Sequence, residues 1–361
     1  MRESRWRRRG SAMGAEGARW RRAPGRTAGA GPGPAVWALA AGAVLACGLF
    51  AGPAGAETLD FTPPRCAAAD RSDARALECN APTIRVREGE LDYNRIGTPE
   101  LYSGWIWRVK ARVNPERPAL FVERREDTLG GRPVHQLVYR FHFEKIPLRL
   151  SRYFFEAHRN PGLMVLVTLD AETGDALFVS AVHTCGCYLA IVPTDAVDPA
   201  WLPEGWSETR RIYGQELPGR LPAADVARGV RVTLESRSHR VSAIEAGTAP
   251  GAGAGRRVEL PLVPMSRLDD LAIDGRQGAR GSFFYTAGPL RGHVRGAWNP
   301  MEGLTAFGLL SLDPTVGMDK KFGDPEVTGT RFYTLLPFWL HEASRLDRMD
   351  SLLRALGYRL P

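Results

Sequence analysis

The sequence predicts a mainly β protein of antiparallel sheets, sandwich-like or α+β, with a short central helix and C-terminal helices. Three observations lead to this fold class. Apolar and polar residues alternate along 105–113 and 137–143, and a period of two is typical of strands with one buried face. Two nearly continuous apolar runs, 163–169 and 176–182, flank the polar segment 170–175, which predicts a hairpin buried on both faces. Residues that favour turns separate these segments.

The first half of the predicted domain follows from these patterns. We expect residues 57–100 to form an irregular arm, because they are polar and lack apolar periodicity. A single β-rich domain then covers 101–361. Its expected elements are, in order, a three-stranded antiparallel meander (105–113, 119–123 and 137–143), a short helix capped by Ser151 and ended by Asn160-Pro161-Gly162, the buried hairpin, and a strand over 188–192.

The second half of the domain has weaker signals. Residues 195–228 are rich in Pro and Trp and are expected to wrap the surface, while 247–256 is a Gly- and Ala-rich segment expected to be a flexible loop. The remaining expected elements are a hairpin (230–235 and 240–244), three short strands (259–263, 283–285 and 304–312) and two helices (331–345 and 349–356), with Gly357 ending the last.

The charge of the chain is concentrated at its start. The formal net charge is +8, from 48 Lys and Arg against 40 Asp and Glu. Residues 1–56 alone hold nine arginines and two glutamates, so the remaining 305 residues carry a net charge of only +1. The predicted folded part therefore has no basic excess, and we expect no nucleic-acid partner.

This basic leader has the order of an export signal. The apolar run 35–51 follows the arginines, and the small-residue motif Ala54-Gly55-Ala56 follows the run, which predicts cleavage after Ala56. Translation starts at Met1 or at Met13. We therefore expect residues 57–361 in the periplasm or cell envelope. Residues 44–47 resemble a lipobox, so lipidation at Cys47 is an alternative. Membrane attachment is expected only with that lipidation or with an uncleaved signal.

If the chain is exported, its cysteines can form disulfides. Four cysteines follow the leader, namely Cys66, Cys79, Cys185 and Cys187. An even number in an oxidising compartment favours disulfides, and four cysteines allow three connectivities. A Cys66–Cys79 bridge would tether the arm. The alternatives join Cys185 to Cys187, or crosslink either of them to the arm.

The stretch His183-Thr184-Cys185-Gly186-Cys187 concentrates more reactive side chains than any other. If it continues the preceding strand, His183, Cys185 and Cys187 point to one face and offer three ligands to zinc or copper. A fourth ligand would come from elsewhere, with His142, His293 and Met301 as candidates by residue type. A strained, reducible Cys185–Cys187 pair or a nucleophilic cysteine are further alternatives.

A second candidate region spans 291–325, which is dense in Gly, Pro, Asp and Trp. Loops of this composition carry function on many folds. The candidate ligand-contacting residues here are His293, Trp298, Glu302, Asp319 and Lys320. At 341–345 the sequence begins like the zinc motif H-E-x-x-H, but Arg345 stands where the second histidine is required.

Together these observations predict a non-enzymatic envelope protein whose β-rich domain, held by disulfides, binds an unknown ligand or protein partner. The alternative is an exported metal-dependent hydrolase or thiol oxidoreductase centred on 183–187. The two classes differ in structure. An enzyme requires those residues beside an open cleft with acid or base groups nearby, whereas the binding hypothesis allows them to be buried.

Overall fold

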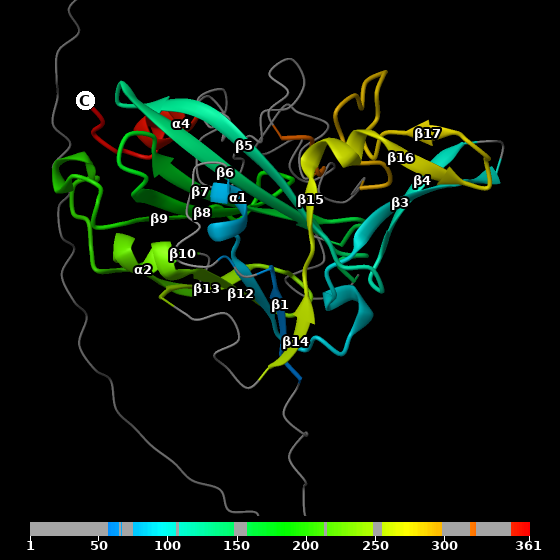
Figure 1. Cartoon of the computed structure of the whole chain (residues 1–361), viewed down its shortest axis with the longest axis horizontal. Helices are drawn as coiled ribbons and strands as arrows, with labels where there is room; N and C mark the ends of the chain where they lie inside the picture. Colours follow the sequence, from blue (N-terminus) through cyan, green and yellow to red (C-terminus); the bar gives the residue numbers. More distant parts are fainter. Residues whose placement is uncertain are drawn as a thin grey trace, which may run out of the picture. The chain divides into compact units, whose positions relative to one another are not determined.

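A computed structural model describes residues 57–64, 66, 75–105, 108–147, 157–212, 215–247, 255–297, 318–322 and 348–361. These residues belong to one compact unit, Gly52–Pro361. The fold is mainly β, as predicted, with several mixed sheets and few helices (Figure 1). The leader with Cys47, the helix expected from Ser151, the loop residues 248–254, the strand expected at 304–312 and the helix expected at 331–345 lie outside the described residues.

A six-stranded sheet in the order β15-β5-β6-β7-β8-β9 forms the centre of the fold. Its strands are β5 (Leu120–Leu129), β6 (Arg132–His142), β7 (Gly162–Asp170), β8 (Ala176–His183), β9 (Ala190–Pro193) and β15 (Leu262–Pro264). The strands β5 to β9 pair antiparallel in sequence order, and β15 joins β5 in parallel. The predicted hairpin is confirmed, since β7 and β8 are paired and buried at every position.

Both faces of this sheet are covered by apolar cores. Along β7, Leu163 and Val165 face one cluster, while Met164 and Leu166 face another. The first cluster continues into a second sheet, and the second is closed by the C-terminal helix α4 (Met349–Ala355). A strand covered on both faces needs apolar residues at successive positions, which explains the continuous runs in the sequence.

The second sheet has the order β13-β12-β2-β1-β14. Its strands are β1 (Leu59–Thr62), β2 (Thr83–Val86), β12 (Val230–Leu234), β13 (Val241–Ala246) and β14 (Arg256–Glu259). The β12–β13 hairpin is confirmed. The expectation that 57–100 is an irregular arm is wrong, because β1 and β2 are interior strands of this sheet. At four residues each, they are too short to display a period.

A third sheet has the order β17-β16-β3-β4. Its strands are β3 (Thr98–Ser103), β4 (Val109–Asn114), β16 (Leu271–Asp274) and β17 (Arg280–Gly281). The predicted meander is therefore wrong, because β4 pairs with β3 while β5 and β6 belong to the central sheet. Alternation identified β4 and β6 as strands but carried no information about their partners.

The remaining elements are short. They are β10 (Thr209–Ile212), β11 (Gln215–Pro218), α1 (Ala76–Cys79), α2 (Ala223–Arg228), η3 (Asp92–Asn94), η6 (Pro199–Trp201) and η7 (Met265–Asp269). Helix α4 is followed by Gly357 at φ +89°, which confirms the predicted helix and its terminator. Among the described helices, none has the length and apolar composition of a membrane span.

Candidate functional site

The stretch 183–187 forms a turn and does not continue the strand. β8 ends at His183, whose N–H donates to the Cys187 carbonyl at 3.0 Å, and the Gly186 N–H donates to the His183 carbonyl at 2.8 Å. Gly186 has a φ of +89°, a conformation that favours glycine. His183, Cys185 and Cys187 therefore do not form a row along one strand face. Within the described ranges, no three His, Cys, Asp or Glu side chains are grouped as a metal site.

The cysteines divide into two pairs of different chemistry. Cys66 and Cys79 form a disulfide that joins α1 to the chain after β1. Cys185 and Cys187 are buried thiols. The alternatives that crosslink 185 or 187 to the arm are thus wrong, because both arm cysteines are already used. Each thiol is 4% exposed, and such burial limits access by a substrate or an oxidant.

His183 is held by Tyr188 and by His239 of the turn between β12 and β13. Its Nε2 lies 3.1 Å from the His239 carbonyl, and its ring meets the Tyr188 ring edge-on at 5.2 Å. His239 itself stacks on Phe143 at 3.7 Å. Burial, together with the neighbouring His183, lowers the pKa of His239 well below its ordinary value. These contacts give the turn a packed, interior setting.

The two sequence regions singled out above meet at Asp319. The Asp319 carboxylate accepts hydrogen bonds from His158 Nε2 at 2.6 Å, from the Gly162 N–H at 2.9 Å and from the Thr184 hydroxyl. Burial opposes its charge, but the electrostatic effect of His158 and the three hydrogen bonds outweigh burial and hold the pKa of Asp319 at about 2. All three donors are used to stabilise one carboxylate. The arrangement therefore anchors residues 318–322 to the end of the central sheet.

Lys320 extends the same anchor. Its N–H donates to the Thr184 carbonyl at 3.0 Å, and its Nζ donates to the Cys185 carbonyl at 3.4 Å. Its own carbonyl accepts a hydrogen bond from Arg140 Nη1 at 2.8 Å. His293 pairs with Lys320 as an isolated β-bridge. The structure thus brings together His293, Asp319 and Lys320, whereas Trp298 and Glu302 lie outside the described residues.

Arg140, on β6, is a fully buried cation beside this anchor. Its Nε donates to His142 Nε2 at 2.8 Å, which requires a neutral His142 with its proton on Nδ1, near the Asn160 carbonyl. Burial and the charge of Arg140 lower the pKa of His142 to about 3. Burial also lowers the pKa of Arg140, to about 10. The Arg140 Nη2 has no hydrogen-bond partner among the described residues.

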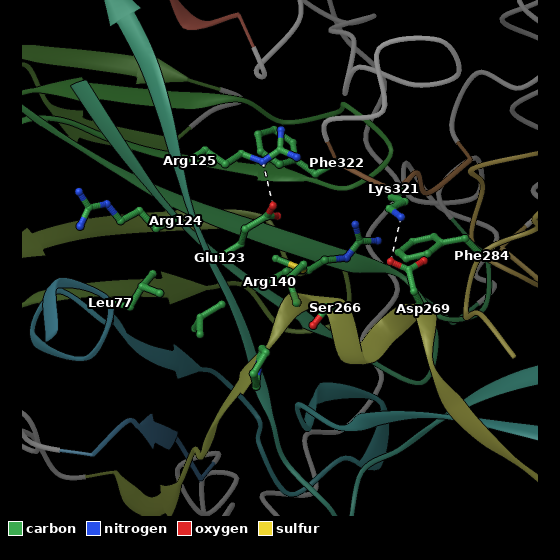
Figure 2. Close-up of a pocket in the computed structure, with 13 residues that line it drawn as sticks. Leu77, Glu123, Arg124, Arg125, Arg140, Ser266, Asp269, Phe284, Lys321 and Phe322 are labelled. Carbon is green, nitrogen blue, oxygen red and sulfur yellow. Dashed lines mark hydrogen bonds and ion pairs between the residues drawn. The ribbon is translucent and has the colours of Figure 1, made fainter. Parts of the chain in front are cut away.

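Arg140 forms part of the wall of a pocket of about 640 Å³. Strands β5 and β6, helix η7 and the segment 318–322 provide most of the lining. Figure 2 shows Arg140, Asp269, Phe284 and Lys321 at one end, and Leu77 and Arg124 at the other. The full lining comprises Leu77, Val122, Glu123, Arg124, Arg125, Arg140, Pro264, Met265, Ser266, Asp269, Phe284, Lys321 and Phe322.

The sequence did not reveal this pocket, because the alternation along 137–143 predicts a strand with only one buried face. One signal could have corrected that interpretation. The neighbouring strand β7 is apolar on both faces, and a strand beside it in the interior of a sheet is covered on both faces as well. An Arg-x-His pair on such a strand is buried, and buried charge is a sign of function.

Comparison with known protein families, with curated proteins and with solved structures finds no match to this chain.

Proposed function

We propose that this chain is an exported envelope protein whose β-rich domain binds a small ligand without transforming it, in the pocket beside Arg140. The Cys66–Cys79 disulfide reinforces the domain. The basic leader and its A-x-A motif support export to the periplasm or cell envelope.

One observation carries the proposal. Arg140 is 0% exposed, lies in the pocket wall, and has an Nη2 group for which the described residues provide no acceptor. A buried cation with an unsatisfied donor is costly to the folded state. A pocket of about 640 Å³ with a few convergent polar groups has the size and composition of small-molecule sites. A bound ligand that supplies the missing acceptor would recover part of that cost.

The alternative enzyme, centred on His183, Cys185 and Cys187, has less support. Both thiols are buried, and neither of them lines the pocket. The carboxylate nearest in this region, Asp319, is occupied by three donors.

Native mass spectrometry of the protein purified from the bacterial envelope tests the proposal. We expect a species heavier than the chain by one small molecule, which is lost on denaturation. The variant Arg140→Lys should co-purify with much less of it, and the exposed-site control Arg228→Lys should be unaffected. Recovery of only the bare chain would contradict ligand binding. A retained zinc or copper ion lost in His183→Ala would instead favour the enzyme.

A further inference from the structure

The pocket beside Arg140 has a charge imbalance. Four of its lining side chains are cationic (Arg124, Arg125, Arg140 and Lys321) and two are anionic (Glu123 and Asp269). Both carboxylates already have cationic partners. Glu123 lies 3.2 Å from Arg125 Nε, and Asp269 lies 2.8 Å from Lys321 Nζ. The lining therefore carries two more positive than negative groups, which favours an anion over a neutral or cationic ligand.

The two cations at one end of the pocket are differently placed. Arg140 is fixed by its bonds to His142 and to the Lys320 carbonyl, so its guanidinium is held in one orientation. Lys321 is half-buried, with a side chain that is 38% exposed, and it reaches the same end from the neighbouring segment (Figure 2). The Phe284 ring lies 5.1 Å from the Arg140 guanidinium carbon and 5.8 Å from Lys321 Nζ. Both cations therefore lie close to the same aromatic ring.

Apolar and aromatic side chains also line the rest of the pocket, beside Glu123, Arg124, Arg125 and Ser266. Val122, Met265 and Phe322 are among its lining residues. Leu77 lies at the end away from Arg140 (Figure 2). The Arg125 guanidinium covers the Phe322 ring at 4.8 Å. A carboxylate or phosphate alone is far smaller than a pocket of about 640 Å³. A ligand that fills it therefore needs an apolar body in addition to its charged group.

We propose that the pocket binds an amphipathic anion. Its carboxylate or phosphate accepts hydrogen bonds from Arg140 Nη2 and Lys321 Nζ, and its apolar body lies against Met265, Phe322 and Leu77. A planar guanidinium and an ammonium group converging on one anion form charge-assisted hydrogen bonds, which are stronger than neutral ones. This inference rests on the proposed binding function and specifies the ligand class.

Isothermal titration calorimetry with four probes of the same chain length tests whether the ligand is an amphipathic anion. The probes are octanoate, octyl phosphate, octanol and octylammonium. We expect both anions to bind, octanol to bind about 10- to 100-fold more weakly, and octylammonium to bind more weakly still, because each charge-assisted bond lost is worth about that factor. The ranking of octanoate against octyl phosphate identifies which anion the site prefers.

Three variants localise the charged group. Lys321→Met should weaken binding of the preferred anion about tenfold while leaving octanol unchanged, and its half-buried side chain makes misfolding a small risk. Arg140→Lys should weaken it further, because lysine cannot reproduce the guanidinium geometry. Asp269→Asn should strengthen anion binding, since it removes one of the two carboxylates that line the pocket. The control Arg228→Met alters an exposed cation on α2, outside the lining, and should leave affinity unchanged.

The outcomes separate this inference from the proposed function. If all four probes bind equally and none of the variants matters, the pocket binds ligands but the anion inference is overturned. If only the charged group is recognised, as shown by equal binding of acetate and octanoate, the amphipathic part is overturned. If no probe binds at millimolar concentration, and the protein from the envelope carries no ligand, both the inference and the proposed function fail.

Discussion

The Asp319 carboxylate accepts a hydrogen bond from His158 Nε2 at 2.6 Å, across a sequence separation of 161 residues. Both side chains are buried, at 1% and 4% exposed respectively. The contact connects the chain before β7 to the segment 318–322, which provides Lys321 and Phe322 to the pocket. This buried hydrogen bond thus fixes one wall of the proposed binding site.

Removal of this carboxylate should destabilise the fold. We expect Asp319→Ala to lower the free energy of unfolding by about 3 kcal/mol or more, because it leaves His158 and two other buried donors without their acceptor. Urea unfolding followed by circular dichroism measures the change. The control Asp270→Ala removes an exposed carboxylate and should leave stability nearly unchanged. Equal effects at the two positions would contradict the anchoring role.

Acid should destabilise the protein through its buried neutral histidines. His142 and His239 have pKa values lowered by burial, to about 3 for His142. Each is neutral when folded but binds a proton below pH 6.5 when unfolded. Their stabilising contribution is therefore complete above pH 6.5 and is lost as the pH falls towards the folded pKa. In this window, we expect the free energy of unfolding to fall by about 1.4 kcal/mol for each histidine and each unit by which the pH is lowered.

The variant His142→Gln, measured alongside the parent chain, isolates one of these groups. The slope of unfolding free energy against pH between 6 and 4 should fall by about 1.4 kcal/mol per pH unit. Asp319 acts in a lower window, since its folded pKa of about 2 lies below its ordinary value of 3.8 and its contribution is lost only between about pH 4 and 2. An unchanged slope in His142→Gln would show that His142 is protonated in the folded protein.

The disulfide should stabilise the protein by closing a short loop. Cys66 and Cys79 are separated by 13 positions, and a loop of this length is worth about 3 kcal/mol in the chain-entropy account. We expect a reductant to lower the free energy of unfolding by about 3 kcal/mol. Reductant should have no effect on the double variant Cys66→Ser/Cys79→Ser. Alkylation of the unfolded, non-reduced protein should label two cysteines of 57–361, Cys185 and Cys187; labelling of none would indicate a second disulfide.

Gly162 should tolerate no side chain. A Cβ at this position would lie 2.6 Å from His142 Cε1 and 2.6 Å from the Thr184 hydroxyl oxygen. Gly162→Ala would therefore displace two side chains around Asp319, and we expect a loss of about 2 kcal/mol or more by thermal unfolding. Gly281→Ala is the control, because its closest atom is a Leu101 methyl group at 3.2 Å. A similar small loss at both positions would contradict close packing at Gly162.

The sequence by itself determined the fold class and several local elements. The period of two identified β6, the doubly apolar runs identified β7 and β8, and Gly357 marked the end of α4. These features depend on side chains a few residues apart, so they can be predicted from the sequence alone. Composition also located the basic excess in residues 1–56 and predicted export, which remains a prediction.

Only the tertiary structure decided which strands pair and which charges are buried. β1 and β2, from a segment without periodicity, became interior strands, and β4 joined β3 instead of β5. Arg140 became the buried cation of a pocket because other layers cover its strand, and Asp319 met His158 and Thr184 through long-range folding. Strand partners and burial depend on contacts between residues that are distant in sequence. The local pattern of one sequence does not indicate these contacts.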